Sequence, residues 1–194
     1  MAAWIWATDA NAGPPGWLSR ANGERFYFWS YYLAPVLPYG EMASLAINSI
    51  PDMVNQVLAA AGTDKIERLI IYGHAESGMQ AVGCGTNFDT TRSDCDFLKL
   101  TPGTGILRNG AEAELARLKP QLAPDARVSL GGCEVAAPPD GESLLKRIST
   151  VLGGVTVEGG LWLQTSLWPG YEGPVVRCTA NSCTTMRGPF KELR

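Results

Sequence analysis

Two short runs of strand-forming residues constrain the fold of this chain more than any other feature. Leu69–Tyr72 is continuously apolar and leads into His74, and a run of the same shape, Val128–Leu130, leads into Cys133. Short apolar runs of this kind are typical of strands buried on both faces of a parallel sheet. The sequence therefore predicts two central strands, each followed by a side chain that can take part in catalysis.

Helical patterns alternate with these and further strands. Helices are predicted over Glu41–Ala61, Ala111–Leu122 and Gly141–Leu152, and further strands over Trp4–Thr8 and Val155–Val157. Pro51 is expected to start a new turn or to kink the first helix. Alternation of strands and helices indicates an open α/β sheet that is mainly parallel. Because crossovers between parallel strands are right-handed, we expect helices over both faces of the sheet.

Two segments depart from this alternation. Residues 75–108 are rich in Gly, Thr, Asn and Asp and are predicted to form a loop, long enough to be functional rather than a simple connection. Near the end of the chain, two β-prone stretches flank the turn-like residues Thr179–Ser182. They predict a β-hairpin over about residues 174–186.

The five cysteines leave at least one thiol outside any disulfide. The predicted hairpin places Cys178 and Cys183 at bridging distance, and Cys84 and Cys95 bracket a polar loop and could also pair. Cys133 is then the cysteine left reduced. A bridge in the hairpin would point to an oxidising destination; the alternative is that all five cysteines are reduced.

Length and charge narrow the classes of protein. The 194 residues favour a single domain, 1–194, that needs no metal or disulfide framework. The net charge is −3 without a basic cluster, so we expect no nucleic-acid partner. No apolar stretch approaches the roughly 20 residues that cross a bilayer, so we expect no membrane span. The first residues make a poor signal peptide, so we expect a cytoplasmic chain, one exported by a non-classical route, or a piece of a larger protein.

His74 is the one histidine of the chain, and it is predicted to meet Cys133 at the carboxyl ends of neighbouring strands. An imidazole can accept the proton of a thiol and later protonate a leaving amine. Taken singly, a cysteine after a strand is more often a small buried apolar residue, and a lone histidine more often a residue without catalytic function. The shared strand context of the two residues favours a catalytic pair.

Acidic residues are predicted near the same edge. Asp9 and Glu158 are expected at carboxyl ends of strands, where ligands of open α/β sheets bind, and they would favour a basic substrate side chain in a pocket there. Glu76 follows His74 closely. Glu76 or Asp9 could orient the imidazole ring, and the sequence does not decide between them.

The segments around His74 and Cys133 resemble those of the caspase-like (clan CD) cysteine peptidases, which include caspases, gingipains, clostripain, legumain, separase and bacterial CHAT domains. They are most similar to bacterial CHAT-like domains of adhesin-type proteins. The resemblance lies within about residues 65–178. It is carried by Ile70-Ile71-Tyr72-Gly73-His74-Ala75-Glu76-Ser77-Gly78, by Leu130-Gly131-Gly132-Cys133-Glu134-Val135-Ala136-Ala137, by Gly141 and Leu144-Leu145, and by Glu172-Gly173-Pro174-Val175.

This resemblance implies a caspase-like three-layer αβα sandwich and a hydrolase that cleaves peptide or protein substrates through a thioester acyl-enzyme, without a cofactor. Cys133 would be the nucleophile and His74 the general acid/base. The backbone N–H groups of Cys133 and Ala75 would form the oxyanion hole, although the family usually has glycine at the position of Ala75.

Two other functions stay open. One is a non-catalytic caspase-like binding or effector module of a bacterial secreted or surface system, which would bind a larger effector or secretion partner. The other is a different cysteine hydrolase or transferase that acts on small amides or cell-wall peptides.

Other candidate sites have weaker signals. Zinc at Cys84, Cys95 and His74 lacks a paired-cysteine motif, and calcium at Asp89, Asp94 and Asp96 matches no known loop spacing. We therefore expect no metal. Trp162 and Trp168 are more simply packing residues, although they could line a cleft.

Overall fold

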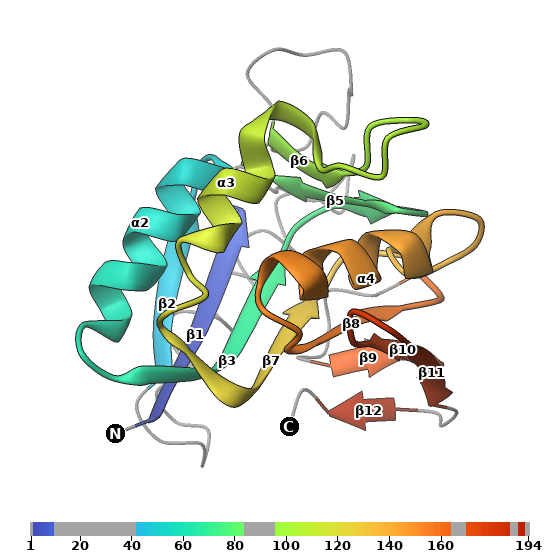
Figure 1. The fold of residues 1–194 in the computed structure, drawn as a ribbon. Helices are drawn as coiled ribbons and strands as arrows, with labels where there is room; N and C mark the ends of the chain where they lie inside the picture. The colour runs from blue at the N-terminus through green and yellow to red at the C-terminus, as the bar shows by residue number, and fades with distance from the viewer. Residues whose placement is uncertain (1, 10–41, 84–95, 164–169, 187–189, 193–194) are drawn as a thin grey trace, which may run out of the picture.

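The computed structural model describes residues 2–9, 42–83, 96–163, 170–186 and 190–192, which form an α/β fold (Figure 1). Its large sheet contains β1 (Ala2–Asp9), β2 (Met42–Ile47), β3 (Lys65–Tyr72), β7 (Leu122–Leu130), β8 (Thr156–Gly160), β10 (Val175–Cys178) and β11 (Cys183–Met186). Within the described residues this sheet has seven strands in the order β11-β10-β8-β7-β3-β1-β2. The pairs from β2 to β8 are parallel, and β10 and β11 are added antiparallel. The predicted α/β class with a mainly parallel sheet is confirmed.

Strands β3 and β7 contain the two runs from which the fold was predicted, and both begin earlier than predicted. They pair in parallel, with Ile71 opposite Leu130. The register shifts between Ile66 and Arg68, where β7 accommodates Pro124. Proline has no N–H for a ladder hydrogen bond, which explains why this part of β7 is irregular. Beyond the shift, the two strands pair residue by residue up to Ile71 and Leu130.

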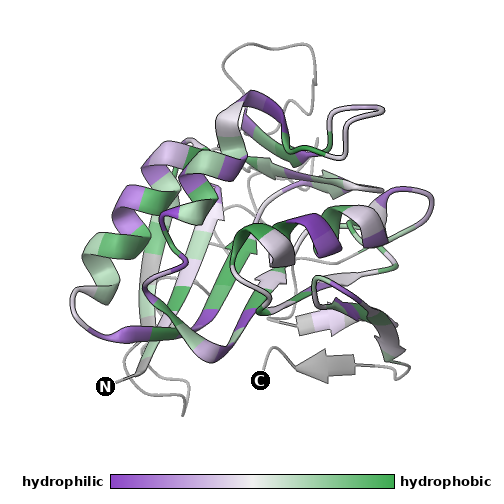
Figure 2. Cartoon of the chain, viewed as in Figure 1, coloured by the Kyte–Doolittle hydropathy of each residue, from purple (hydrophilic) through white to green (hydrophobic). Residues whose placement is uncertain are grey.

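The described helices lie on one face of the large sheet (Figure 1). They are α2 (Ile50–Ala61), α3 (Ala111–Ala116), which follows the short 3-10 helix η4 (Arg108–Gly110), and α4 (Gly141–Val151). All three contribute to one buried core with the helix-side residues of β1, β3, β7 and β8. Figure 2 shows the apolar colour along β3 and β7 beneath α4. Among the helices described, none is long and apolar enough to cross a membrane.

The strand order explains why these helices share a face. From β2 through β3 and β7 to β8, the chain always moves across the sheet in the same direction. Right-handed crossovers that advance in one direction place their helices on the same side. The expectation of helices on both faces is therefore not met by the described residues.

The second face of the sheet carries a smaller core and part of a two-stranded sheet. Trp6, Ile70 and Val175 pack there against Tyr171. Tyr171 belongs to β9 (Gly170–Glu172), which pairs with β12 (Phe190–Glu192). The Tyr171 hydroxyl lies 3.0 Å from the Leu130 carbonyl and 3.1 Å from the Glu158 carbonyl, which share its one hydrogen. This tyrosine therefore ties β9 to both β7 and β8.

Residues 42–61 form a strand and a helix rather than one long helix. Met42–Ile47 is β2, paired in parallel with β1, and α2 begins only at Ile50. Ser49 caps that helix by accepting a hydrogen bond from the Asp52 N–H, and Pro51 occupies its first turn, where a missing N–H costs nothing. The prediction of a helix over 41–61 was therefore wrong for residues 42–49. The third predicted helix, over 141–152, closely matches α4.

Residues 75–108 are more ordered than a loop, as far as the structure describes them. They contain β4 (Ala75–Glu76), β5 (Met79–Val82) and β6 (Asp96–Lys99), which form a small antiparallel sheet. The β4–β5 hairpin starts directly after His74. Its position makes it part of the candidate site.

The predicted terminal hairpin is formed by β10 and β11, in which Cys178 lies opposite Cys183. A disulfide joins these two cysteines, whose Cα atoms are 4.1 Å apart. Such closeness is typical of a pair that is not hydrogen-bonded in an antiparallel ladder. The other proposed pair, Cys84 and Cys95, lies outside the described residues.

Candidate functional site

His74 and Cys133 follow neighbouring parallel strands in the same register. Ile71 lies opposite Leu130, and His74 and Cys133 each follow their strand's paired residue by the same number of positions. A backbone hydrogen bond of 2.8 Å from the Gly131 N–H to the Ile71 carbonyl holds the strands together just before the site. Both residues are partly exposed, and Cys133 takes no part in a disulfide. The structure thus brings the two candidate residues to one edge of the sheet.

The carboxyl end of β3, which leads into His74, borders the point where the strand order reverses. The parallel strands follow the order β2-β1-β3-β7-β8, so the direction of winding changes between β1 and β3. Open α/β sheets bind ligands beyond the carboxyl ends of the strands at this point. Asp9 ends β1 and is buried, and its Cβ lies 3.3 Å from the point where a side chain at Gly73 would begin. Asp9 therefore lies beside the residue that precedes His74.

The turn that carries Cys133 is held from two sides. On the β8 side, the Glu134 N–H donates to the Trp162 carbonyl at 2.9 Å, and the Ala136 N–H donates to the Gly160 carbonyl at 3.0 Å. Glu134, directly after Cys133, has φ +53°, a left-handed conformation that costs a non-glycine residue about 1–2 kcal/mol. The surrounding hydrogen bonds keep the chain in this sharp turn.

On the other side, the tip of the β4–β5 hairpin docks onto the same turn. The Gly78 N–H donates to the Val135 carbonyl at 3.1 Å. The Ser77 hydroxyl lies 2.7 Å from the Ala137 carbonyl and 2.9 Å from the Pro138 carbonyl. The segments after His74 and after Cys133 therefore form one connected unit.

Gln80 connects the two segments at the base of the hairpin. Its side chain is fully buried on β5, and its Oε1 accepts a hydrogen bond of 3.1 Å from the Gly132 N–H. Its Nε2 donates to the carbonyls of His74 and Ala81, at 3.3 and 3.1 Å. The sequence reasoning missed this residue. The available signal was one amide side chain in the otherwise apolar stretch Met79–Val82.

Ala75 adopts a backbone conformation that suits alanine. Glu134 and Asn109 are the non-glycine residues with positive φ in the described part of the chain, so Ala75 has an ordinary backbone. The Ala81 N–H donates to the His74 carbonyl at 2.8 Å, and the next pair of the hairpin is Ala75 with Gln80. Because hydrogen-bonded and non-bonded pairs alternate in antiparallel ladders, the Ala75 N–H points away from β5.

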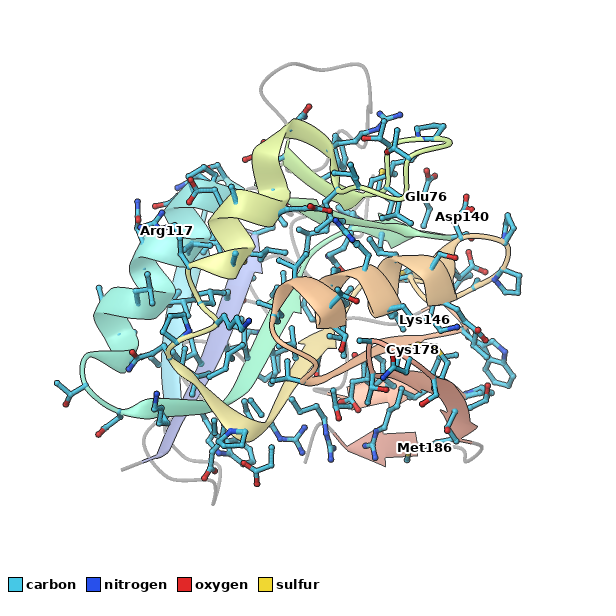
Figure 3. All side chains as sticks on the ribbon, viewed as in Figure 1. Glu76, Arg117, Asp140, Lys146, Cys178 and Met186 are labelled. Carbon is cyan, nitrogen blue, oxygen red and sulfur yellow. A yellow bond between two sulfur atoms is a disulfide. The ribbon has the colours of Figure 1, made fainter. Side chains whose placement is uncertain are left out.

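Glu76 lies at the hairpin but faces solvent. Its carboxylate is half exposed and lies 3.8 Å from the Lys99 ammonium on β6. Figure 3 shows Glu76 and Asp140 at the same end of the molecule, where the turn at Gly78 packs against Asp140. Of the two candidates for orienting His74, the buried Asp9 lies next to Gly73, whereas Glu76 pairs with a surface lysine.

The expected position of Glu158 requires a correction. Strand β8 continues to Gly160, so Glu158 lies in mid-strand, opposite Ser129. Its buried carboxylate accepts a hydrogen bond of 2.8 Å from the Ser129 hydroxyl and one of 2.6 Å from Arg177 Nε. Arg68 and Arg127 lie 4.0 and 3.8 Å away. These partners explain why a carboxylate can be buried there, and they give it no position in a pocket at the strand ends.

This charged cluster also affects its neighbours. Burial, and to a smaller extent the negative charge of Glu158, raises the pKa of Tyr171 well above its ordinary value. Burial, followed by the charge of Arg127, lowers the pKa of the Arg68 guanidinium. The cluster lies on the sheet face opposite the helices and contributes to stability rather than to the candidate site.

The residues considered for a metal site or for the lining of a cleft lie in different parts of the chain. Asp96 accepts a hydrogen bond of 2.8 Å from the Ile50 N–H, so it holds the start of α2. Trp162 is largely exposed just beyond β8, next to the Cys133 turn. Cys84, Cys95, Asp89, Asp94 and Trp168 lie outside the described residues. Within the described ranges, no group of three or more Cys, His, Asp or Glu residues could hold a metal ion.

Comparisons with known proteins found no matching family model, no matching curated protein and no matching solved structure.

Proposed function

We propose that this chain is a caspase-like cysteine peptidase that uses His74 and Cys133 to cleave peptide bonds. The observation that carries the proposal is the register of β3 and β7, in which these two residues follow paired strands at equal distance. The sequence resemblance around both residues supports the same assignment, including its three-layer αβα sandwich. The pair lies beyond the carboxyl ends of parallel strands, one of which, β3, borders the reversal of strand order, and this position supports a ligand site.

The proposed reaction has two steps. The Cys133 sulfur attacks the substrate carbonyl carbon while His74 accepts the thiol proton, and His74 then donates that proton to the leaving amine as the C–N bond breaks. The resulting thioester is hydrolysed by a water molecule that His74 deprotonates, which releases the acid and restores the thiol. The N–H groups of Cys133 and Ala75 stabilise the oxyanion, with each donor contributing about 3–4 kcal/mol.

Asp9 is the acidic residue proposed to favour substrates with a basic side chain before the scissile bond. It is buried at the end of β1, beside Gly73. A buried carboxylate near a substrate pocket is stabilised when a lysine or arginine side chain of the substrate enters it. Glu158 has no part in this proposal, because its carboxylate is bound by Ser129 and Arg177.

A panel of fluorogenic peptides tests the proposal with the full chain. The panel varies the residue before the scissile bond, and the wild-type protein is compared with Cys133→Ala and His74→Ala. We expect hydrolysis by the wild type, with a preference for basic residues, and a loss of at least about 1,000-fold in both variants. Hydrolysis that survives Cys133→Ala would refute the dyad. Asp9→Asn, with the dyad intact, should reduce the preference for basic residues.

Reactivity of the thiol gives a second test that needs no substrate. Brief treatment with iodoacetamide, followed by mass spectrometry, should alkylate Cys133 faster than the other reduced cysteines. The pH dependence of this rate should change in His74→Ala. A Cys133 that does not react in the folded protein contradicts the peptidase assignment.

A further inference from the structure

The residues on both sides of His74 and the residue before Cys133 are so closely packed that a side chain at Gly73 or at Gly132 would interfere. A Cβ at Gly132 would overlap the Ala75 Cβ and lie 2.9 Å from the Gly73 carbonyl oxygen. A Cβ at Gly73 would lie 2.8 Å from the Ala81 carbonyl oxygen. Contacts this short do not occur between ordinary side chains, so both glycines are required by the packing.

The Gln80 amide occupies the space beside these glycines. Its Nε2 lies 3.3 Å from the Cβ position of Gly73, and its Oε1 lies 2.7 Å from that of Gly132. The same amide accepts from the Gly132 N–H and donates to the His74 carbonyl. A neutral amide side chain has an oxygen that accepts hydrogen bonds and a nitrogen that donates them, so one residue can bond to both segments.

The ladder between β3 and β7 pairs residues as far as Ile71 and Leu130, and the Gly131 N–H donates to the Ile71 carbonyl just beyond them. Gln80 contacts the backbone of His74 itself and of the residue adjacent to Cys133. Since the side chain is fully buried, its bonds are shielded from competing water.

We propose that Gln80 is a positioning residue that sets the relative placement of His74 and Cys133. The inference rests on the proposed function, because it assigns Gln80 a role in aligning the proposed catalytic pair. Gln80 acts through backbone hydrogen bonds and touches neither the thiol proton nor the substrate. Its loss should lower the rate of the chemical step and leave substrate binding largely unchanged.

Gln80→Met tests this role, because methionine has a similar length and cannot form the three hydrogen bonds. The matched control is Gln121→Met. The Gln121 amide also bonds two backbone carbonyls, those of Asp64 and Gly62, and its residue lies just ahead of β7, at the opposite end from Cys133. Gln80→Glu is the isosteric second variant: it keeps an acceptor for the Gly132 N–H and, when ionised, loses the donor for the His74 carbonyl.

The first readout is the rate of Cys133 alkylation by iodoacetamide between about pH 6 and 9, where an ordinary thiol ionises. The second is kcat and KM for a peptide that the wild type cleaves. We expect Gln80→Met and Gln80→Glu to alter the pH profile as His74→Ala does, and to lower kcat by about 10- to 100-fold with little change in KM. Gln121→Met should reproduce the wild-type values.

The outcomes separate the two proposals. A folded Gln80→Met protein with the wild-type pH profile overturns the positioning role, provided that His74→Ala alters the profile, and leaves the dyad intact. A wild-type profile that His74→Ala does not alter overturns the dyad and, with it, the role of Gln80. If Gln80→Met does not fold, the isosteric Gln80→Glu decides by the same criteria.

Discussion

Adding one methyl group at Gly132 is expected to force apart the segments that carry His74 and Cys133. The new Cβ would overlap the Ala75 Cβ and lie 2.7 Å from the Gln80 Oε1. Overpacking of a tight site costs about 1–3 kcal/mol, and displacing a buried amide from its partner adds about 1–3 kcal/mol. We therefore expect Gly132→Ala to lower the free energy of unfolding by about 3 kcal/mol, a large part of a typical stability of about 5–15 kcal/mol.

The Ala75 Cβ is the atom responsible for the closest of these contacts, so removing it should relieve part of the cost. Ala75→Gly alone should cost about 0.5–1 kcal/mol through backbone entropy. In the double variant, Gly132→Ala meets no Cβ at position 75, although the Gln80 and Gly73 oxygens remain close. The double variant should therefore lose about 1.5 kcal/mol less than the sum of the single variants.

Urea unfolding followed by tryptophan fluorescence measures this cycle, and an unchanged slope with denaturant shows that the unfolded states are comparable. Gly131→Ala paired with Ala75→Gly is the control, because a Cβ at Gly131 would contact the Tyr72 ring at 2.5 Å instead. That pair should be additive. Additivity within about 0.5 kcal/mol for the Gly132 pair as well would refute the proposed contact between the two segments.

Four further predictions concern stability. Glu158→Gln should cost about 3 kcal/mol in urea unfolding, because it leaves the surrounding arginine charges without their buried carboxylate; an effect below about 0.5 kcal/mol would contradict the ion cluster. Replacing both Cys178 and Cys183 by serine should lower stability by about 2 kcal/mol, the entropy expected for so short a closed loop, and reductant should then have no further effect. Glu134→Gly should be more stable than Glu134→Ala by about 1 kcal/mol, because only glycine adopts φ +53° without strain; the reverse order would exclude that turn. Since the pKa of Tyr171 is raised, the folded state holds its proton more tightly than the unfolded state does, so stability should fall as pH rises above the ordinary tyrosine value of about 10. Urea titrations at increasing pH should show this decline, and a decline of equal slope in Tyr171→Phe would assign it to another group.

The parts of the fold that were predictable are those set by local pattern. The apolar run before His74 and the stripe of α4 have the periodicities of a buried strand and an amphipathic helix. The helix was predicted to begin too early, because apolar residues at helical spacing continue from Ile47 into α2. Ser49 and Pro51 indicate the correct start, since a capping serine shortly before a proline is typical of the first turn of a helix.

The features that were not predictable depend on partners distant in the sequence. Glu158 was placed at a strand end because the predicted strand, Val155–Val157, stopped just before it. Its burial in mid-strand depends on Arg68, Arg127 and Arg177, which come from three other strands. Gln80 likewise acquires its partners only when the hairpin folds back between His74 and Gly132. Such contacts between residues distant in the sequence cannot be predicted from local sequence patterns.

The position of β1 between β2 and β3 has a consequence for the order in which the sheet assembles. Strands β2 and β3 are consecutive along the chain through α2, yet they are separated in the sheet by β1, which pairs with both. The β2-α2-β3 unit therefore cannot close as two adjacent strands, and its closure depends on a contact with a segment more distant in sequence. Removal of β1 would not shorten the sheet at an edge; it would separate β2 and α2 from the strands that carry His74 and Cys133.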